Sequence, residues 1–496
     1  MEAGLFEASA SFLFFDYFRV PYRVASTSHD LWPSRLPERH PLRACDRLYG
    51  KGHDASSGML WWPSFNAARS PLNRLLPAAP HRLESIPIFG RVLPDYLCGS
   101  WLSQTGVTWT RSAPIWDVHG NRVGSEWRGN DGSTFLPYDP AEIIQNYWSE
   151  GYHEVAGGSS AARVKKLIME IYYKARPMLP RTIQIWMRRR FSRIQARCRF
   201  PRWPIETALP DFYARLFRHV AEVTRAPVPW LSPWPNGHTW AFVLTHDVET
   251  VVGYRKISVL RDVEVAAGYR SSWNFVPRRY TVEDDLIRDL AAQGFEVGIH
   301  GLYHDGKDLE SLSTLVERLP AMREYAERWE ASGFRSPATH RAWGWMSLLG
   351  FDYDSSYPDT DPFEPQSGGC CSVLPYFNQE TVELPITLPQ DHTLFVILGH
   401  SDGRLWAEKV NYLKSQGGIA LIITHPDYLS HKGLLNAYRN LLQQVQGDPT
   451  VWRALPREVS SWWRRRAVSR LELKAGGWRV IGPAAGEARI VFTSPG

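Results

Sequence analysis

The chain has 496 residues, enough for about three domains of roughly 150 residues, or for one large enzyme domain with additions. Hydrophobic residues make up 44% and charged residues 22%, which is typical of globular proteins and excludes a disordered, collagen-like or coiled-coil chain. Lys and Arg number 57 against 51 Asp and Glu, so the net charge is +6. That excess is too small for this length to indicate a nucleic-acid partner.

Cysteine usage and the first segment bear on the compartment. The five cysteines have no C-x-x-C spacing, and therefore predict neither a disulfide framework nor a thiolate zinc site. Glu2, Glu7 and Asp16 lie in the first segment, where a secretion signal needs a basic start and an uninterrupted apolar run. No run reaches the roughly 18 apolar residues of a membrane-spanning helix. We therefore expect a cytoplasmic protein without a transmembrane segment.

The N-terminal part of the chain has an irregular pattern. Residues 1–160 are rich in Pro, Gly and Trp and predict an irregular or β-rich region with some helix, including a strand within residues 100–110. Residues 161–235 combine a basic helical segment with a Pro- and Trp-rich linker. Ten basic residues and no acidic one occur between residues 171 and 205. The Arg-rich helix around residues 181–199 is a candidate for peripheral contact with anionic lipid, and the alternative is a surface that is solvated or paired within the protein.

From residue 236 onward, short apolar runs alternate with amphipathic helical segments. The expected strands cover residues 241–245, 271–276, 295–299, 333–336, 351–354, 393–398 and 419–424. The expected helices lie between them, at residues 282–292, 309–330 and 405–416. This alternation predicts an α/β domain with a parallel sheet. Such a sheet is either closed as a barrel or doubly wound, and seven strands without a Gly-rich phosphate loop favour a (β/α)7-type barrel over residues 236–448.

The last segment, residues 449–496, predicts a short tail. It begins with the aromatic and basic sequence SSWWRRRAVSRL, which is typical of a helix. Two strand-like pieces follow at residues 478–481 and 488–493. We therefore expect a C-terminal tail of one helix and two strands after the barrel.

Ionisable residues stand where several of the expected barrel strands end. They are Asp247 and Glu249 after the first strand, His300 and His304 after the third, Arg335 in the fourth, and His425 after the last. The carboxyl ends of parallel barrel strands open onto one face, so these side chains are expected in one site. Two imidazoles and a carboxylate form a common catalytic zinc set. With a second carboxylate as base and a histidine as acid, they predict metal-assisted hydrolysis of an acyl bond.

The order of these motifs resembles the polysaccharide deacetylases, carbohydrate esterase family 4, over about residues 238–445. Members of that family remove N- or O-acetyl groups from sugars on a distorted (β/α) barrel. The resemblance implies that Asp247 is the general base and that His300 and His304 bind the metal. It also implies that Arg335 orients the base and keeps it ionised, and that His425 is the general acid.

The first motif departs from the common family pattern. Most members have two adjacent aspartates there, whereas Val248 follows Asp247. The sequence THDVE is similar to the first motif of a variant subgroup, which has Asp-x-Asp or Asp-x-Glu. This resemblance implies that Glu249 is the third ligand. Whether Asp247 or Glu249 binds the metal stays open. Four further segments also resemble a bacterial branch of the family: HGLYHDGKDL, FRSP, DTDPFEP and ELPITLPQDHTLF. The sequence does not decide which carboxylate partners His425, and the candidates are Asp354, Asp359, Asp361 and Asp391.

Aromatic side chains are candidates for sugar binding, because flat rings can pack on the apolar faces of pyranoses. The chain has 22 Trp, and those near strand ends are the best placed. The candidates are Trp273, Tyr303 and Trp343, with Trp345 close by. For each of the tryptophans, packing in the core is the alternative explanation.

These observations predict a metal-dependent hydrolase that removes an acetyl group from an N-acetylated sugar or a glycan biosynthetic intermediate. The expected cofactor is a divalent metal, with Zn²⁺ best suited to the donor set. One alternative is a catalytically silent barrel that binds glycan as an interaction module in a polysaccharide assembly pathway. Another is a metal-dependent amidase that acts on a non-sugar amide through the same site.

Overall fold

The computed structural model describes residues 5–25, 40–51, 58–65, 76–157, 188–190, 192–196, 198–431 and 433–494. The chain forms two compact units that are discontinuous in sequence. The first consists of Met1–Leu167, Thr207–Ser232 and Arg466–Gly496, and the second of Ile168–Glu206 and Pro233–Arg465. The first unit therefore combines parts of three segments that are separate in the sequence: the N-terminal region, the linker and the C-terminal tail.

The first unit is built on a nine-stranded sheet with the order β2-β1-β3-β4-β9-β8-β7-β5-β6. Its strands are β1 (Leu5–Ala8), β2 (Tyr22–Val24), β3 (Cys45–Lys51), β4 (Met59–Pro63), β5 (Ala79–Leu83), β6 (Ile86–Gly90), β7 (Trp109–Asp117), β8 (Arg122–Gly129) and β9 (Thr134–Phe135). Its helices are α1 (Leu13–Phe18), α2 (Asp95–Leu102), α3 (Pro140–Trp148), α4 (Tyr152–Ala156) and α7 (Ala208–Thr224). The prediction of a β-rich region with helices is confirmed for the described residues.

Two details of this unit differ from or refine the prediction. The expected strand at residues 100–110 is wrong, because α2 and a 3-10 turn (Ser103–Thr105) occupy most of it and β7 begins only at Trp109. Strand β10 (Val228–Leu231) pairs with β22 (Ile490–Thr493), so residues far apart in the sequence form one ribbon. The two strands expected in the tail correspond to β21 (Gly477–Ile481) and β22, whereas β20 (Arg470–Lys474), which pairs with β21, was not predicted.

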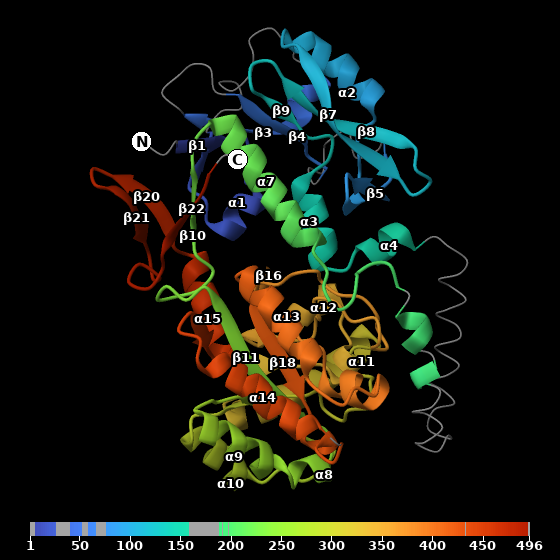
Figure 1. Ribbon diagram of the computed structural model, residues 1–496, viewed down its shortest axis with the longest axis vertical. Coiled ribbons are helices and arrows are strands. Elements are labelled where there is room, and N and C mark those ends of the chain that lie inside the picture. Colours follow the sequence, from blue (N-terminus) through green and yellow to red (C-terminus); the bar gives the residue numbers. More distant parts are fainter. Residues whose placement is uncertain are drawn as a thin grey trace. The chain divides into compact units, whose positions relative to one another are not determined.

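The second unit holds a mostly parallel sheet with the order β16-β17-β15-β14-β13-β12-β11-β18, and β19 pairs with β11. The strands are β11 (Trp240–Val248), β12 (Ser272–Phe275), β13 (Glu296–Ile299), β14 (Gly333–Phe334), β15 (Tyr353–Asp354), β16 (Tyr376–Asn378), β17 (Thr381–Glu383), β18 (Ile419–Thr424) and β19 (Val451–Arg453). Figure 1 shows β11 and β18 side by side and running in the same direction. Every residue of both strands is buried, as expected for a sheet covered on both faces.

Helices accompany this sheet along the chain. They are α8 (Val251–Tyr254), α9 (Ile257–Ala267), α10 (Asp284–Ala292), α11 (Leu312–Trp329), α12 (Trp343–Met346), α13 (Arg404–Ser415), α14 (Leu434–Gln446) and α15 (Pro456–Ala467). The three expected barrel helices correspond to α10, α11 and α13, and six of the seven expected strands are present. The second unit is therefore a mixed α/β structure, as the sequence predicts.

The expected strand at residues 393–398 is wrong. Residues His392–Ile397 form a π-helix, and the Asp391 side chain at its N-cap accepts the His392 backbone N–H at 2.7 Å. Five consecutive residues of this helix are buried, and a short buried apolar run does not distinguish a helix from a strand. Capping by Asp391 supplies the helical start that the apolar pattern does not reveal.

Irregular segments connect β18 to the far side of the sheet. The backbone N–H groups of Thr387 and Leu388 both donate to the Leu421 carbonyl, at 3.2 and 3.0 Å, and Ile419 donates to the Val373 carbonyl at 2.8 Å. Residues 387 and 388 follow β17, and residue 373 precedes β16. The sheet is therefore curled, with hydrogen bonds spanning the gap between its two edges.

Part of the Arg-rich segment is described, whereas residues 181–187, 191 and 197 lie outside the described residues. Residues 188–190 and 192–195 are helical. Arg188 donates to the Glu364 carboxylate at 3.3 Å, and Arg189 donates twice to the Val396 carbonyl, at 3.0 and 2.9 Å. These two arginines are therefore paired within the second unit.

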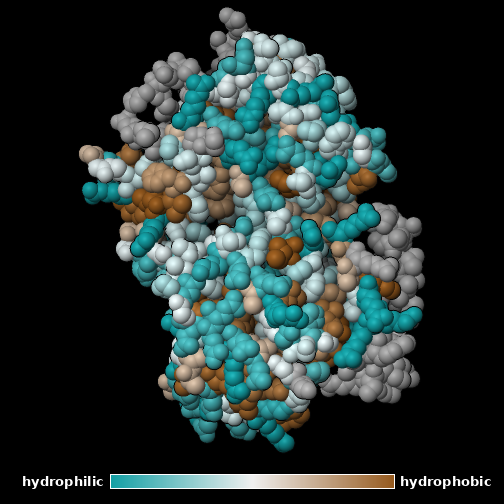
Figure 2. Space-filling model, viewed as in Figure 1, coloured by the Kyte–Doolittle hydropathy of each residue, from teal (hydrophilic) through white to brown (hydrophobic). Residues whose placement is uncertain are grey.

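The exposed surface and the helices bear on membrane contact. The face shown in Figure 2 is largely hydrophilic, with hydrophobic residues mostly in separate groups. Among the described residues, no helix combines the length and the apolar content needed to cross a membrane.

Candidate metal centre and active site

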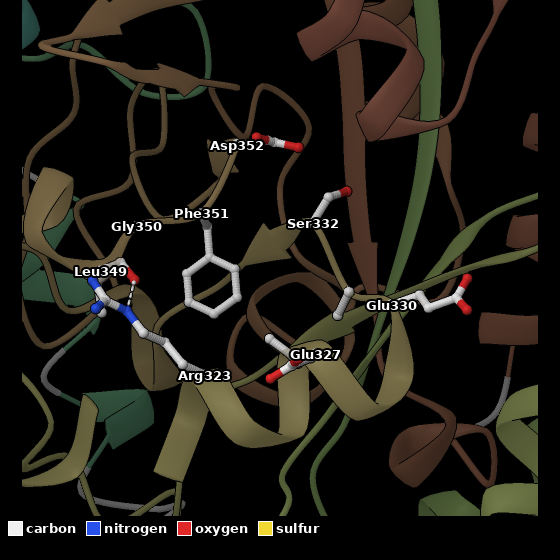
Figure 3. Close-up of a pocket in the computed structure, with 10 residues that line it drawn as sticks. Arg323, Glu327, Glu330, Ser332, Leu349, Gly350, Phe351 and Asp352 are labelled. Carbon is white, nitrogen blue, oxygen red and sulfur yellow. Dashed lines mark hydrogen bonds between the residues drawn. The ribbon is translucent and has the colours of Figure 1, made fainter. Parts of the chain in front are cut away.

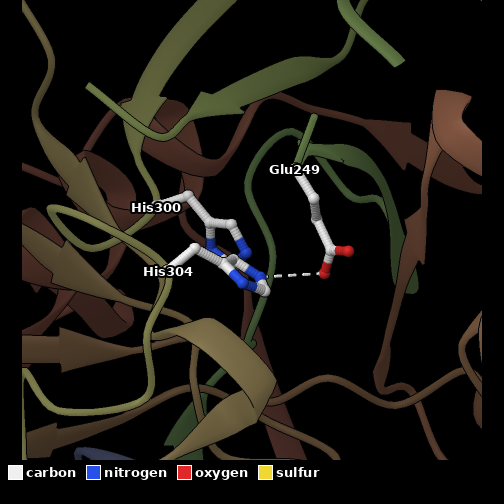
Figure 4. A group of neighbouring side chains, drawn as sticks. All are labelled: Glu249, His300 and His304. Atoms are coloured by element: carbon white, nitrogen blue, oxygen red, sulfur yellow. Dashed lines mark hydrogen bonds and ion pairs between the residues drawn. The ribbon is translucent and has the colours of Figure 1, made fainter. Parts of the chain in front are cut away.

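Three side chains from the carboxyl ends of β11 and β13 converge in the second unit. Glu249 follows β11, and His300 and His304 follow β13. Their ligand atoms all lie within 4.8 Å of one another, and the His304 Nε2 is 3.0 Å from Glu249 Oε1. Figure 4 shows the three side chains pointing toward one another. Two imidazoles and one carboxylate at this spacing can hold a divalent metal ion.

The hydrogen bonding of His300 leaves one nitrogen for a metal. Its Nδ1 lies 3.1 Å from the Arg335 carbonyl, to which it donates. Its Nε2 is buried without a hydrogen-bond partner, and burial lowers the pKa of His300 to about 4. The ring is therefore neutral near pH 7, and the lone pair of Nε2 is free to bind a cation.

The loop geometry brings His304 back to the same point. Gly301 and His304 both have left-handed backbone conformations, with φ of 62° and 57°, so the chain turns sharply after β13. The Asp308 carboxylate accepts the Leu302 backbone N–H at 3.2 Å and fixes this turn. A tight loop therefore brings the two histidines together, although their four-residue spacing would also suit one face of a helix.

Asp247 lies beside the three candidate ligands. Its Oδ2 is 3.9 Å from His300 Nε2, its Oδ1 accepts Asn274 Nδ2 at 2.8 Å, and Arg335 Nη1 lies 3.5 Å away. Burial alone favours the neutral acid, but the positive charges of Arg335 and His425 and the hydrogen bond from Asn274 favour the carboxylate and lower the pKa of Asp247. The carboxylate is thus ionised and available as a base.

Arg335 is fixed by several hydrogen bonds. It is 1% exposed and donates to Thr245 Oγ1 at 2.9 Å, to the Ser355 carbonyl at 2.8 Å and to Ser355 Oγ at 2.9 Å. Its guanidinium is therefore held between the strands at a set distance from Asp247.

His425 faces the other side of the ligand group. Its Nε2 lies 3.7 Å from Glu249 Oε1, and its Nδ1 lies 2.6 Å from Asp391 Oδ1. Burial disfavours the imidazolium, but the adjacent Asp391 carboxylate raises the pKa of His425 to about 10. His425 is therefore a protonated group near pH 7 and can donate a proton.

The structure selects one of the four carboxylates left open by the sequence. Asp391 contacts His425, whereas Asp354 accepts from Ser356, Asp359 pairs with Lys409 at 2.8 Å, and Asp361 accepts the Phe363 backbone N–H. Asp391 precedes the π-helix that was expected to be a strand, which explains why sequence reasoning gave it no priority.

Two further residues near the site were not anticipated. Asn274 stands opposite Asp247 in the β11–β12 register, and the sequence signal for it is an amide next to the aromatic residues of a short strand. Asp427 accepts the Glu249 backbone N–H at 3.2 Å and the Gly253 N–H at 3.3 Å, and Thr250 also donates to it. Asp427 thereby orders the loop that presents Glu249.

The proposed sugar-binding aromatics have different environments. Trp273 is fully buried and packs on His246 with ring centroids 4.1 Å apart, so the structure contradicts its assignment as a sugar platform. Tyr303 is 38% exposed and lies next to His304. Trp343 is partly buried and stacks on Tyr376 with centroids 6.2 Å apart.

A cavity of about 360 Å³ lies elsewhere in this unit. Its lining includes Arg323, Glu327, Ser332 and Phe351 (Figure 3). Residues 332 and 351 precede β14 and β15, so the cavity is at the amino ends of the strands. It is therefore separate from the group of catalytic candidates, which lies at the carboxyl ends.

Neither a family model nor a curated protein matches the chain. Among solved structures, a Mycobacterium smegmatis protein described as a polysaccharide deacetylase is 22% identical with a TM-score of 0.39, over 49% of this chain and 96% of its own. The allantoinase Puue is 16% identical with a TM-score of 0.39, over 47% and 93%. A family 4 carbohydrate esterase from Streptomyces lividans, in complex with acetate, is 13% identical with a TM-score of 0.29, over 43% and 91%. This chain resembles such proteins over about half its length. Because the TM-scores are low, we base the function on the site residues themselves.

Proposed function

We propose that the chain is a metal-dependent hydrolase that removes an acetyl group from an N-acetylated sugar or glycan intermediate. The observation that carries the proposal is the group of Glu249, His300 and His304 within 4.8 Å, flanked by Asp247 and His425. An ionised carboxylate and a protonated imidazole on either side of a metal site are the parts needed to hydrolyse an amide.

The catalytic part is the second unit, which we propose is a distorted (β/α)7-type barrel. Its sheet is parallel except for the β16–β17 pair, and backbone hydrogen bonds at Leu421 and Ile419 span the remaining gap. Every proposed catalytic group lies at or beyond the carboxyl end of a strand, which is where barrel enzymes place their active sites. The first unit supplies none of these groups.

The donor set fits a divalent metal, and Zn²⁺ suits it best. Neutral His300 offers its unpartnered Nε2, and His304 and Glu249 complete three protein ligands, which leaves a coordination position open. When bound, such an ion polarises the acetyl carbonyl and acidifies water. We assign Glu249 as the third ligand because it belongs to the group, and Asp247 as the base because it lies beside it.

The protein's own groups then account for the proton transfers. Asp247 takes a proton from the water whose oxygen attacks the acetyl carbonyl carbon, while Arg335 and Asn274 keep its carboxylate ionised and oriented. His425 donates its Nε2 proton to the leaving nitrogen as the carbon–nitrogen bond breaks, and Asp391 holds its Nδ1–H. The immediate products are acetic acid and a free amine, and the site is restored when Asp247 gives up its proton and His425 regains one.

The test measures metal content and acetate release on the same samples of the full chain. The wild type is expected to bind about one Zn²⁺ and to release acetate from one of a panel of N-acetylhexosamine compounds. His300→Ala should lose the metal, and Asp247→Asn should keep it while acetate release falls by at least about 100-fold. His400→Ala is the matched control, because His400 is exposed and outside the site.

Two outcomes would contradict the proposal. If the wild type binds no metal when zinc is supplied, the hydrolase assignment fails and the glycan-binding module is the better explanation. If metal binds and the panel is inert while a non-sugar amide such as allantoin is hydrolysed, the site is that of an amidase with a different substrate.

A further inference from the structure

His246 forms a buried network on the face of β11 opposite Asp247. It is 0% exposed, and both ring nitrogens are engaged. Its Nδ1 lies 2.7 Å from Thr424 Oγ1, and its Nε2 lies 2.6 Å from Glu264 Oε1. The ring also packs on Trp273. A polar ring in the middle of a buried strand is costly unless fully hydrogen-bonded, so this environment is specific to histidine.

The Glu264 carboxylate joins several elements. It lies on α9 and is 0% exposed. Besides His246, it accepts the hydroxyl of Ser271, which precedes β12, at 2.6 Å, and that of Tyr438 on α14. Three donors to one buried carboxylate fix the helices against the outer face of the sheet. We call His246, Thr424, Glu264, Ser271 and Tyr438 the outer network.

The outer network meets the sheet next to the proton-transfer groups. His246 and Thr424 are register partners in the parallel β11–β18 pair, and the next residues along the two strands are Asp247 and His425. Because successive side chains point to opposite faces of a strand, the outer pair and the inner pair alternate. The hydrogen bond between His246 and Thr424 therefore lies one residue away, along each strand, from Asp247 and His425.

The order hydroxyl, imidazole and carboxylate resembles a nucleophilic triad, but no substrate can reach it. Thr424 and His246 are both 0% exposed, and a nucleophile must contact its substrate. The outer network therefore cannot react with substrate and can act only by positioning other groups.

We propose that the His246–Thr424 bond is a positioning element that sets the separation of Asp247 and His425, so that proton removal and proton donation occur in one geometry. The proposal rests on the function proposed above for these two groups. Catalysis is sensitive to such placement, since a shift of about 1 Å can cost about 100-fold in rate. Every member of the outer network is 0% exposed, so substrate cannot reach it, and its loss should affect turnover and not binding.

The test uses Thr424→Val, which keeps the side-chain shape and removes the hydroxyl. Its matched control is Thr387→Val, because Thr387 is also 0% exposed and its Oγ1 donates to the Ile419 carbonyl at 2.6 Å, but it contacts no proposed catalytic group. Thr424→Val is expected to lower kcat for acetate release by about 10-fold, with KM within about 2-fold and zinc content unchanged. Thr424→Ser should restore kcat, and Thr387→Val should change only the melting temperature.

Crystal structures of the same variants provide a readout that needs no activity. In Thr424→Val the distance between the Asp247 carboxylate and His425 Nε2 should change from the wild-type value, whereas in Thr424→Ser and Thr387→Val it should not. The proposal is overturned if Thr424→Val retains wild-type kcat, or if its Asp247 and His425 keep their positions. If the wild type itself releases no acetate, the proposed function fails, and the crystal structures alone decide whether the outer network positions the two groups.

Discussion

Asp391 accepts two hydrogen bonds from His425, one from the backbone N–H at 2.7 Å and one from Nδ1 at 2.6 Å. Asp391 is 0% exposed and His425 only 4%, so this pair is shielded from screening by water and salt. The two bonds fix the orientation of the ring and leave Nε2 as the nitrogen that faces the candidate metal ligands.

Replacing Asp391 by Asn should therefore impair the proton donor. Without the carboxylate, the pKa of His425 falls from about 10, and kcat for acetate release should drop by about 100-fold or more. The pH–rate profile checks the cause. Wild-type activity should decline as pH rises toward 10, where His425 loses its proton, and the variant should decline at lower pH. An unchanged alkaline limb would show that His425 is not the acid.

The same pair should make stability depend on pH. The pKa of His425 is raised from about 6.5 in the unfolded chain to about 10. Its contribution to the free energy of unfolding is therefore fully present below about pH 6.5 and is lost as pH rises through about 10. Urea unfolding of the metal-free protein at several pH values tests this. The stability difference between wild type and Asp391→Asn should shrink from pH 6 to pH 10, and a constant difference would contradict it.

Much of the second unit follows from the sequence because its strands are short, apolar and bounded by polar residues. The apolar runs within β11 and β18 fit strands that are buried in a parallel sheet. The polar residues at the ends of these strands indicate where the site lies. By contrast, the run at residues 393–398 has the same composition and forms a π-helix, since its start is set by the Asp391 cap and the packing around it.

The residues that support the site were harder to predict for a physical reason. Asn274, Asp391 and Asp427 act through contacts with residues at least 27 positions away in the chain, and local patterns carry no information on such pairs. The prediction for Trp273 was wrong because a residue near a strand end can lie either in a cleft or in the core. Only the tertiary contacts of Trp273 with His246 and Phe295 decide between these environments.

Gly301 is required where the chain turns between the two histidine ligands. Its φ is 62°, and a Cβ there would lie 2.4 Å from Asp308 Oδ2 and 2.7 Å from Pro337. Gly301→Ala should therefore lower the free energy of unfolding by about 1–3 kcal/mol and weaken zinc binding by about 10-fold. Thermal unfolding and competition with a zinc chelator measure the two effects. Gly344→Ala is the control, since a Cβ at that position would meet no atom within 4 Å. Equal zinc affinity in both variants would contradict the prediction.

Trp273 and Tyr303 should separate core packing from substrate binding. Trp273→Phe leaves a gap in the core, and is expected to lower the melting temperature while KM stays unchanged. Tyr303→Ala removes an exposed ring beside the site, and should raise KM by about 10-fold with little change in melting temperature. Tyr303→Phe keeps the ring and should keep KM near the wild-type value. If Tyr303→Ala leaves KM unaltered, this ring does not contact the substrate.

The first unit depends on a buried charge cluster around Glu126. Arg215 donates to this carboxylate at 2.9 and 2.5 Å, and His219 Nε2 lies 3.1 Å away. Although burial opposes ionisation, the charges of His219 and Arg215 hold the pKa of Glu126 well below its usual range. Glu126→Gln leaves Arg215 with only the half-exposed Glu84 carboxylate, 3.0 Å away, and removes the charge beside His219, so it should lower the free energy of unfolding by about 3–5 kcal/mol at pH 7.

Urea unfolding with Glu472→Gln as control tests the role of this cluster, since Glu472 pairs with Arg470 at the surface of the same unit. The control should change the free energy of unfolding far less than Glu126→Gln, because water and salt screen an exposed ion pair. The contribution of Glu126 is present above the pKa of about 4.3 in the unfolded chain and is lost as pH falls toward the lower folded value. The effect of Glu126→Gln should accordingly shrink in acid. Equal effects of the two substitutions at pH 7 would mean that the Glu84 carboxylate alone compensates Arg215 when Glu126 is neutralised.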